Sequence, residues 1–215
     1  MHLHLPTIQL ALYTSPKVLS TSLKHWAFEF ENGRTFEPYL AQGFAKNIHH
    51  IYPTNLFAST THENGFTRVA IVRDPLDRFT SLYRNRVLRK HGAASPYWNK
   101  IVEHGLPYTP SLEFFVNEFE AYVSLSKDIA HHSRPQIDFL GTSAAWYDHV
   151  FSFQDVNQLE KFLTNRIGEP QTLPHEQGSS KYSNSEIAKK NLPRGSKRRI
   201  KKLFKDDYEV FGRFF

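Results

Sequence analysis

The stretch that decides the fold is VAIVRDPLDRFTSLYR, at residues 69–84. Its first four residues are small or β-branched and apolar, which predicts a buried strand over 69–72. Pro75 is favoured in the first turn of a helix, and the apolar residues that follow recur at helical spacing, so we expect a helix over 76–89. Arg73 therefore stands where a strand ends and a helix is about to begin.

The same strand–loop–helix order occurs nearer the N-terminus. Residues 8–13, IQLALY, form a short apolar run without Gly or Pro, which predicts a second buried strand. Pro16 ends that strand, and hydroxyl side chains at 20–22 are candidate N-caps for a helix that ends at Asn32-Gly33.

Further elements are expected along the rest of the chain. The patterns predict helices over 112–125 and 155–163, a strand over 149–153, a loop over 168–185, and a last basic helix with an apolar stripe. Strands that alternate with helices indicate a single α/β domain over residues 1–215, with a central parallel sheet flanked by helices. Ligands of such sheets bind at the carboxyl ends of the strands, which is where both polar loops lie.

Charge and composition narrow the function classes. The chain has 215 residues and a formal net charge of +6, but residues 189–205 hold nine Lys or Arg and no acid, which leaves −3 elsewhere. There is no Cys, so disulfides, thiol nucleophiles and Cys-bound zinc are excluded. No apolar run is long enough for a membrane helix, and residues 1–17 lack the pattern of a signal peptide, so we expect a cytoplasmic protein.

The first polar loop is SPKVLSTS, at residues 15–22. A helix N-terminus exposes unpaired N–H groups and a partial positive charge. These features form a cradle for anions, and Lys17 and three hydroxyl groups would add to it. The loop contains no Gly, so it is not a Walker A loop. An ordinary capped helix with a solvated Lys17 is the alternative interpretation.

The second polar loop follows the strand at 69–72. The Arg73 guanidinium can donate two hydrogen bonds to a phosphate group. Ser81 lies eight residues further on, in the predicted helix. A structural ion pair of Arg73 with Asp74 or Asp77 is the alternative interpretation.

Together the two loops resemble the sulfotransferase superfamily, in the branch that contains carbohydrate O-sulfotransferases and their bacterial relatives. The pattern PKxxSTS after one strand and VRDPxxRxxSxYR after another carries the resemblance. Three later segments are similar as well: HHSRPQ at 131–136, YDHVF at 147–151 and DDY at 206–208. The resemblance implies a P-loop-like sulfotransferase fold and transfer of a sulfuryl group from 3′-phosphoadenylyl sulfate (PAPS) to an acceptor hydroxyl, without a metal.

The resemblance also implies roles for individual residues. The first loop would bind the 5′-phosphosulfate end of PAPS, and Arg73 with Ser81 would bind its 3′-phosphate. Lys181, in the loop GSSK, would cover the 3′-phosphate and adenine. His131 and His132 would line the site of a carbohydrate acceptor. The first-loop residues with this implied role are Pro16, Lys17, Ser20, Thr21 and Ser22.

A general base must take the proton of the acceptor hydroxyl, and His is the natural choice because its pKa lies near working pH. Family members with a His base carry it between the two donor motifs, which points to His49 and His50. We favour His49, because Ile48 and Ile51 could flank an inward position. Three carboxylates remain as weaker options: Glu29, Glu31 and Glu63.

Two other function classes compete with this interpretation. A nucleotide kinase or other phosphotransferase would share the strand–loop–helix cradle, but the Walker glycines and a clear Mg²⁺-binding Asp after a strand are missing. A nucleic-acid-binding module could use the basic residues 189–205. No helix-turn-helix, zinc-finger or RNP pattern accompanies them, so we expect no nucleic-acid partner.

Overall fold

The computed structural model describes residues 2–58, 65–89, 96–174 and 191–215. The chain separates into two compact units. The first unit comprises residues 1–73, 136–181 and 210–215, and the second comprises 74–135 and 182–209. The expectation of one domain over residues 1–215 stays a prediction.

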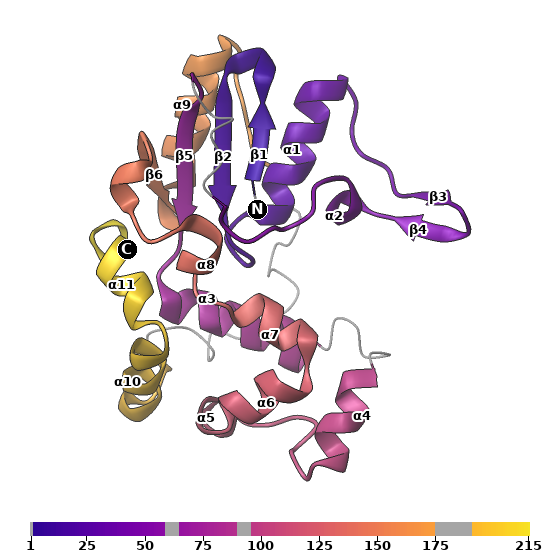
Figure 1. Cartoon of the computed structure of the whole chain (residues 1–215), viewed down its shortest axis with the longest axis vertical. Helices are drawn as coiled ribbons and strands as arrows, with labels where there is room; N and C mark the ends of the chain where they lie inside the picture. Colours follow the sequence, from indigo (N-terminus) through magenta and orange to yellow (C-terminus); the bar gives the residue numbers. More distant parts are fainter. Residues whose placement is uncertain (1, 59–64, 90–95, 175–190) are drawn as a thin grey trace. The chain divides into compact units, whose positions relative to one another are not determined.

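A four-stranded sheet forms the centre of the first unit (Figure 1), in the order β1-β2-β5-β6. β2, β5 and β6 are parallel, which confirms the predicted α/β class, but β1 pairs antiparallel with β2 and makes the sheet mixed. A four-residue turn joins β1 to β2, and so short a connection allows only antiparallel pairing. The strands are β1 (His2–Leu5), β2 (Leu10–Thr14), β5 (Thr67–Val72) and β6 (His149–Ser152).

Both faces of this sheet are buried, as the continuous apolar runs of β2 and β5 require. Leu12 and Ile71 belong to the core cluster that includes side chains of α1 (Ser20–Asn32) and α9 (Val156–Ile167). The alternate residues point the other way: Tyr13 packs with α8 (Ile137–Leu140) and the C-terminal residues. The sheet is therefore the rigid frame on which the polar loops are mounted.

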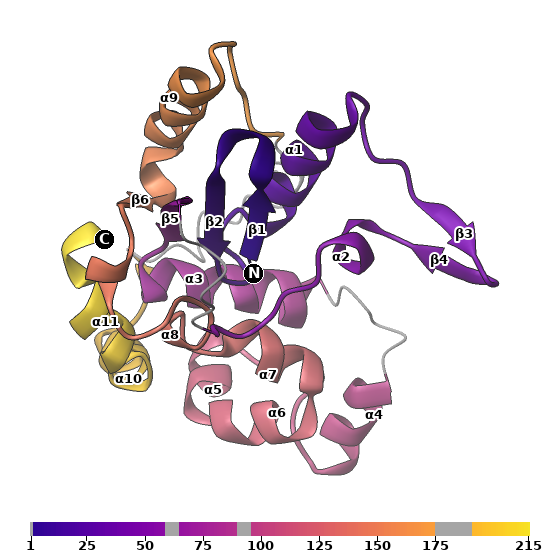
Figure 2. The same ribbon diagram turned by 45° about the horizontal axis from the view of Figure 1, so that its top comes forward.

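A small hairpin and a short helix lie between α1 and β5. Figure 2 shows β3 (Tyr39–Ala41) and β4 (Phe44–Lys46) extending away from the sheet, followed by α2 (Ile48–Ile51). The segment after α2 is tied to the same unit through Phe57, whose N–H donates to the Asp138 carbonyl at 2.8 Å. The Phe57 ring packs on Gly141, where an added Cβ would come within 2.8 Å of the ring.

The second unit is helical around a cluster of aromatic side chains, and three of its core rings are Phe79, Phe115 and Tyr122. The helix predicted over 76–89 continues beyond residue 82 as a π-helix, and the helix predicted over 112–125 is interrupted at Glu118. Glu118 leaves helical geometry, with φ −104° and ψ 21°. The elements of the second unit are α3 (Pro75–Leu82), the π-helix (Tyr83–Leu88), α4 (Pro96–Glu103), α5 (Leu112–Asn117), α6 (Phe119–Leu125), α7 (Lys127–Ser133) and α10 (Arg194–Leu203). α11 (Lys205–Phe211) belongs to it as far as residue 209.

Residues 194–203 of the basic stretch form a packed amphipathic helix, α10, as the apolar stripe predicted. Ile200 and Phe204 are buried in the core of the second unit. Arg199 donates to the Val116 carbonyl at 2.9 Å and to Glu120 at 2.7 Å, so part of the basic charge has structural partners. Across the described ranges, no helix is long and apolar enough to cross a membrane.

Shortening a side chain at the centre of the sheet should destabilise the protein strongly. Ile71 on β5 is fully buried, so Ile71→Ala should lower the free energy of unfolding by about 2–5 kcal/mol through lost burial and a cavity. Leu40 in the hairpin is 78% exposed, and Leu40→Ala should change it by less than about 0.5 kcal/mol. Urea unfolding of both variants measures this, and equal effects would contradict the assigned core.

Candidate functional site

The two polar loops meet at one edge of the sheet in the first unit. β2 and β5 are parallel with Thr14 opposite Ile71, so both strands end at the same level. Arg73, just beyond β5, donates from Nη1 to the carbonyl oxygen of Lys17 at 3.0 Å. The structure therefore joins the two motifs that the sequence placed 56 positions apart.

The first loop is tightly folded although it contains no Gly. Lys17 and Leu19 both adopt left-handed backbone conformations, with φ of 70° and 53°. The Thr14 hydroxyl donates to the Val18 carbonyl, and the Val18 N–H donates to the Ser15 carbonyl at 3.2 Å. Left-handed geometry at non-Gly residues costs energy and is often found at binding sites. The loop thus has the strained backbone of a ligand clamp.

The first turn of α1 differs from the predicted capping. α1 begins at Ser20 after Leu19, and no side chain caps it, so the prediction that Ser20, Thr21 or Ser22 is the N-cap is wrong. The left-handed Leu19 makes Ser20 the first helical residue. The first-turn N–H groups have no acceptor within the helix, and this is the arrangement that binds anions. Nearby, the buried Ser15 Oγ has no hydrogen-bond partner among the described residues.

Arg73 is held in place by two side chains that sequence reasoning did not assign. The Gln136 side chain accepts from the Arg73 N–H at 3.0 Å and donates to the Arg73 carbonyl at 2.8 Å. The Arg73 guanidinium lies 4.0 Å from the ring centroid of Phe153, a cation–π contact. Gln136 belongs to the HHSRPQ segment, and that motif was the signal in the sequence that could have pointed to it. No pattern in the sequence pointed to Phe153.

Ser81 belongs to the second unit, where it is half-buried on α3. Pro75 stands in the first turn of α3, as predicted. Asp74 caps this helix by accepting from the Leu76 N–H at 2.8 Å, and the Tyr208 hydroxyl donates to the same carboxylate at 2.8 Å. Burial, and then the hydrogen bond to Asp74, raise the pKa of Tyr208, so its hydroxyl remains a donor.

The two His residues favoured as bases have different partners on α2. The Asn47 N–H donates to His50 Nδ1 at 3.1 Å and the Asn47 side chain accepts from the His49 N–H at 3.0 Å, a reciprocal cap. His49 turns its Nδ1 toward Lys24 Nζ, at 3.0 Å. The His50 side chain therefore caps the N-terminus of α2, whereas the His49 side chain contacts α1.

Lys24 is a buried cation on α1 that sequence reasoning missed. It is 0% exposed, and its Nζ also donates to Thr54 Oγ1 at 3.0 Å. Burial lowers its pKa to about 8. Lys24 follows Ser20 by four residues, so the two share one face of α1. His49 is thus attached to the helix whose uncapped first turn follows the first polar loop.

Two of the weaker base candidates, Glu29 and Glu31, lie on α1. Glu31 accepts a hydrogen bond from the Tyr52 hydroxyl at 2.6 Å, and Glu29 is exposed on α1. Glu63 and Lys181 lie outside the described residues, so their predicted roles stay predictions.

Comparison with known proteins gives a family for this arrangement. The model of the Sulfotransferase family matches residues 6–214, nearly the whole chain. The chain belongs to the sulfotransferase family. No curated protein and no solved structure matches significantly. Sulfuryl transfer is therefore the general chemistry assigned to this family member, and the family implies a hydroxyl acceptor.

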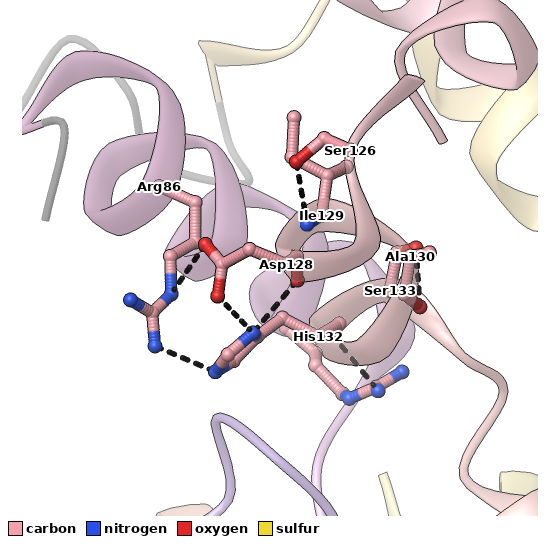
Figure 3. Close-up of polar contacts among 8 residues, drawn as sticks. Arg86, Ser126, Asp128, Ile129, Ala130, His132 and Ser133 are labelled. Atoms are coloured by element: carbon pink, nitrogen blue, oxygen red, sulfur yellow. Dashed lines mark hydrogen bonds and ion pairs between the residues drawn. The ribbon is translucent and has the colours of Figure 1, made fainter. Parts of the chain in front are cut away.

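The second unit of this sulfotransferase contains an Asp–His–Arg cluster (Figure 3). Arg86 Nη2 lies 2.6 Å from His132 Nε2, and His132 Nδ1 lies 2.8 Å from the Asp128 carbonyl and 3.2 Å from its carboxylate. A guanidinium can only donate, so His132 Nε2 accepts and Nδ1 carries the proton. Both ring nitrogens of His132 therefore have protein partners. Arg86 comes from the π-helix, a distortion common at functional sites.

The neighbouring His131 is a neutral imidazole at pH 7. Burial is the main cause that lowers its pKa to about 4. Its ring meets that of His132 edge-on, with centroids 5.1 Å apart. A neutral imidazole can donate and accept hydrogen bonds, which suits the predicted role of contacting a hydroxylated acceptor. Within the described part of the chain, no three His, Asp or Glu side chains gather as metal ligands.

The Asp128 cluster should make stability depend on pH. Burial alone would raise the pKa of Asp128, but its contacts with His132 and Arg86 lower it overall. A lowered pKa stabilises the folded state above the ordinary carboxyl pKa of about 3.9, and this contribution is lost as the pH falls below it. Asp128→Asn should therefore lower the melting temperature at pH 7, with a smaller difference near pH 3.

The matched control is Glu103→Gln, at an exposed position of the same unit. It should change stability little at either pH. A difference between Asp128→Asn and the unmutated protein that stays constant from pH 7 to pH 3 would contradict the ion-pair role of Asp128.

Proposed function

We propose that this chain transfers the sulfuryl group of PAPS to a hydroxyl group of a carbohydrate or glycoconjugate by in-line displacement. The observation that best supports this is the hydrogen bond from Arg73 to the Lys17 carbonyl, because it joins the two phosphate-type motifs in one unit. The buried Ser15 hydroxyl without a partner, beside an uncapped helix N-terminus, fits a site for a phosphorylated donor.

The first loop is proposed to hold the reacting end of the donor. Lys17, next to Pro16, would neutralise the charge that grows on the leaving phosphate. The first-turn N–H groups and the hydroxyls of Ser20, Thr21 and Ser22 would donate to the same oxygens. Such preorganised donors are usually the largest contribution to catalysis of this kind.

Arg73 and Ser81 are proposed to bind the 3′-phosphate. Gln136 and Phe153 support this role for Arg73, because they fix its backbone and its guanidinium plane before any ligand arrives. A guanidinium fixed in this way loses little rotational freedom on binding. Lys181 is proposed to cover the donor from its loop.

His49 is proposed as the base and His131 with His132 as contacts of the acceptor. The support for His49 over His50 is its contact with Lys24, since His50 Nδ1 is used in the cap of α2. The support for His131 is that its neutral ring can exchange hydrogen bonds with sugar hydroxyls.

The donor proposal has a direct test by thermal shift. A ligand that binds the folded state raises its melting temperature. We expect 3′,5′-ADP, the product left by PAPS, to stabilise the protein more than ATP with Mg²⁺. The reverse order would instead support a phosphotransferase. Retention of unrelated DNA with a steep salt dependence would favour a nucleic-acid-binding module that uses the exposed face of α10.

Replacing the two donor-binding cations should have different kinetic effects. Lys17→Ala should lower kcat by about 10²–10³-fold, because it removes stabilisation of developing charge. Arg73→Met should raise the KM for PAPS by about 10–100-fold, as expected for a lost charge-assisted hydrogen bond. Transfer from radiolabelled PAPS to chondroitin, heparosan and simple glycosides measures both, and near-normal turnover of either variant would refute the assignment.

Separate replacement of the two neighbouring His residues should identify the base. His49→Ala should lower kcat by about 10²–10⁴-fold, because general-base catalysis contributes that much. His50→Ala should affect mainly stability, since it removes one hydrogen bond of the α2 cap. The same transfer assay applies, and a larger loss of kcat in His50→Ala would reverse the assignment.

A further inference from the structure

The contact between Lys24 and His49 is more than a packing detail. Lys24 is fully buried, and a buried ammonium is costly unless its hydrogen bonds are satisfied or its proton is lost. Its Nζ contacts Thr54 Oγ1 and His49 Nδ1, each at 3.0 Å. Neither carries a negative charge. Because no negative charge stabilises the ammonium form, a lysine with two neutral hydrogen-bond partners can lose its proton more easily.

The protonation state of Lys24 decides the tautomer of His49. An ammonium only donates, so it requires an accepting Nδ1 and leaves the His49 proton on Nε2. A neutral amine has two N–H bonds and one lone pair. It can donate to Thr54 and accept from His49 Nδ1–H, and in that tautomer Nε2 carries no proton. Only this second arrangement lets Nε2 act as a base.

We propose that Lys24 and His49 act as one proton-accepting unit, in which the neutral Lys24 amine accepts the Nδ1 proton while Nε2 takes the acceptor's proton. The inference rests on the proposed role of His49 as the base. Lys24 does not touch the reacting atoms; it is a positioning residue and a proton acceptor behind His49.

The step balances with the groups already named. The acceptor O–H bond breaks and its proton moves to His49 Nε2, while the Nδ1 proton moves to Lys24 Nζ. The acceptor oxygen forms a bond to sulfur, and the bond from sulfur to the donor phosphate oxygen breaks. The electron pair of that bond leaves on the phosphate oxygen. His49 ends neutral and Lys24 ends as an ammonium.

The groups on the elements packed against Lys24 fit this assignment. On α2, His50 is held by Asn47 in the cap, and Tyr52 just beyond it pairs with Glu31 of α1. β1 carries His2 and His4, whose rings pack with Tyr13. Lys24 Nζ makes its contact with the His49 ring and not with one of these other titratable groups.

The pair should titrate near the pKa of Lys24 rather than that of an isolated imidazole. Burial lowers the pKa of Lys24 to about 8, so the neutral amine becomes the major form above that pH. On the acidic side of the pH profile, kcat should then increase with a midpoint of about pH 8, and not at the ordinary His pKa of about 6.5. The measured value belongs to the coupled pair and not to either residue alone.

The first experiment reads the tautomer directly and needs neither donor nor acceptor. Nitrogen-15 NMR of the His rings is recorded from pH 6.5 to 9.5, and the His49 signals are assigned by their loss in His49→Gln. We expect the proton on Nε2 at low pH and on Nδ1 at high pH. In Lys24→Gln the amide oxygen accepts from Nδ1 at every pH. In Lys24→Arg the guanidinium only donates, so the proton stays on Nε2.

The second experiment measures transfer by the same variants. Lys24→Gln should keep kcat within about 10-fold and move its acidic limb from about 8 toward about 6.5. Lys24→Arg keeps the charge but should lose about 10²-fold in kcat, because Nε2 stays protonated. In a His49→Ala background, Lys24→Arg should cause no further loss. Lys161→Gln, at an exposed site of α9, is the matched control and should leave turnover unchanged.

The outcomes separate this inference from the proposed function. If the unmutated chain transfers nothing from PAPS, the proposed function fails, while the NMR result still tests the Lys24–His49 exchange. If transfer occurs but Lys24→Arg is as active as the unmutated chain, Lys24 has only a structural role. A His49 tautomer that does not change from pH 6.5 to 9.5 also overturns the inference.

Discussion

The parallel pairing of β2 with β5 is the constraint on which the site depends. Their register brings Thr14 opposite Ile71, so the loop after each strand emerges at the same edge. Apolar side chains on both faces of the two strands fix this register, because a slip by one residue would exchange the buried faces. The hydrogen bond between Arg73 and Lys17 is a consequence of that register.

Around this edge, polar groups are preorganised by burial. Gln136, fully buried, satisfies both backbone groups of Arg73, and Lys17 and Leu19 hold strained backbone angles without Gly. Fixing these groups during folding means that a bound anion does not have to order them. The energy of the apolar core thus maintains a loop geometry that the loop alone would not keep.

The sequence alone predicted much of the fold and the two polar loops that meet at one edge of the sheet. The α/β class followed from alternating apolar runs, and the helix after Pro75 and the polar loops followed from strong local signals. Local signals also misled: Ser20 is not a cap, and the helix predicted over 112–125 is interrupted at Glu118. At both places the backbone departs from the geometry that propensity favours, because Leu19 is left-handed and Glu118 leaves helical angles.

Residue types and spacing by themselves determined the family resemblance and the residues proposed to hold a phosphorylated donor. Only the tertiary structure decided that Gln136 and Phe153 hold Arg73, and that His49 rather than His50 contacts Lys24. Lys24 and His49 are 25 positions apart on different helices, and nothing in the pattern of either helix marks the contact. Burial of a charge depends on what packs over it, and spacing along one chain segment does not contain that information.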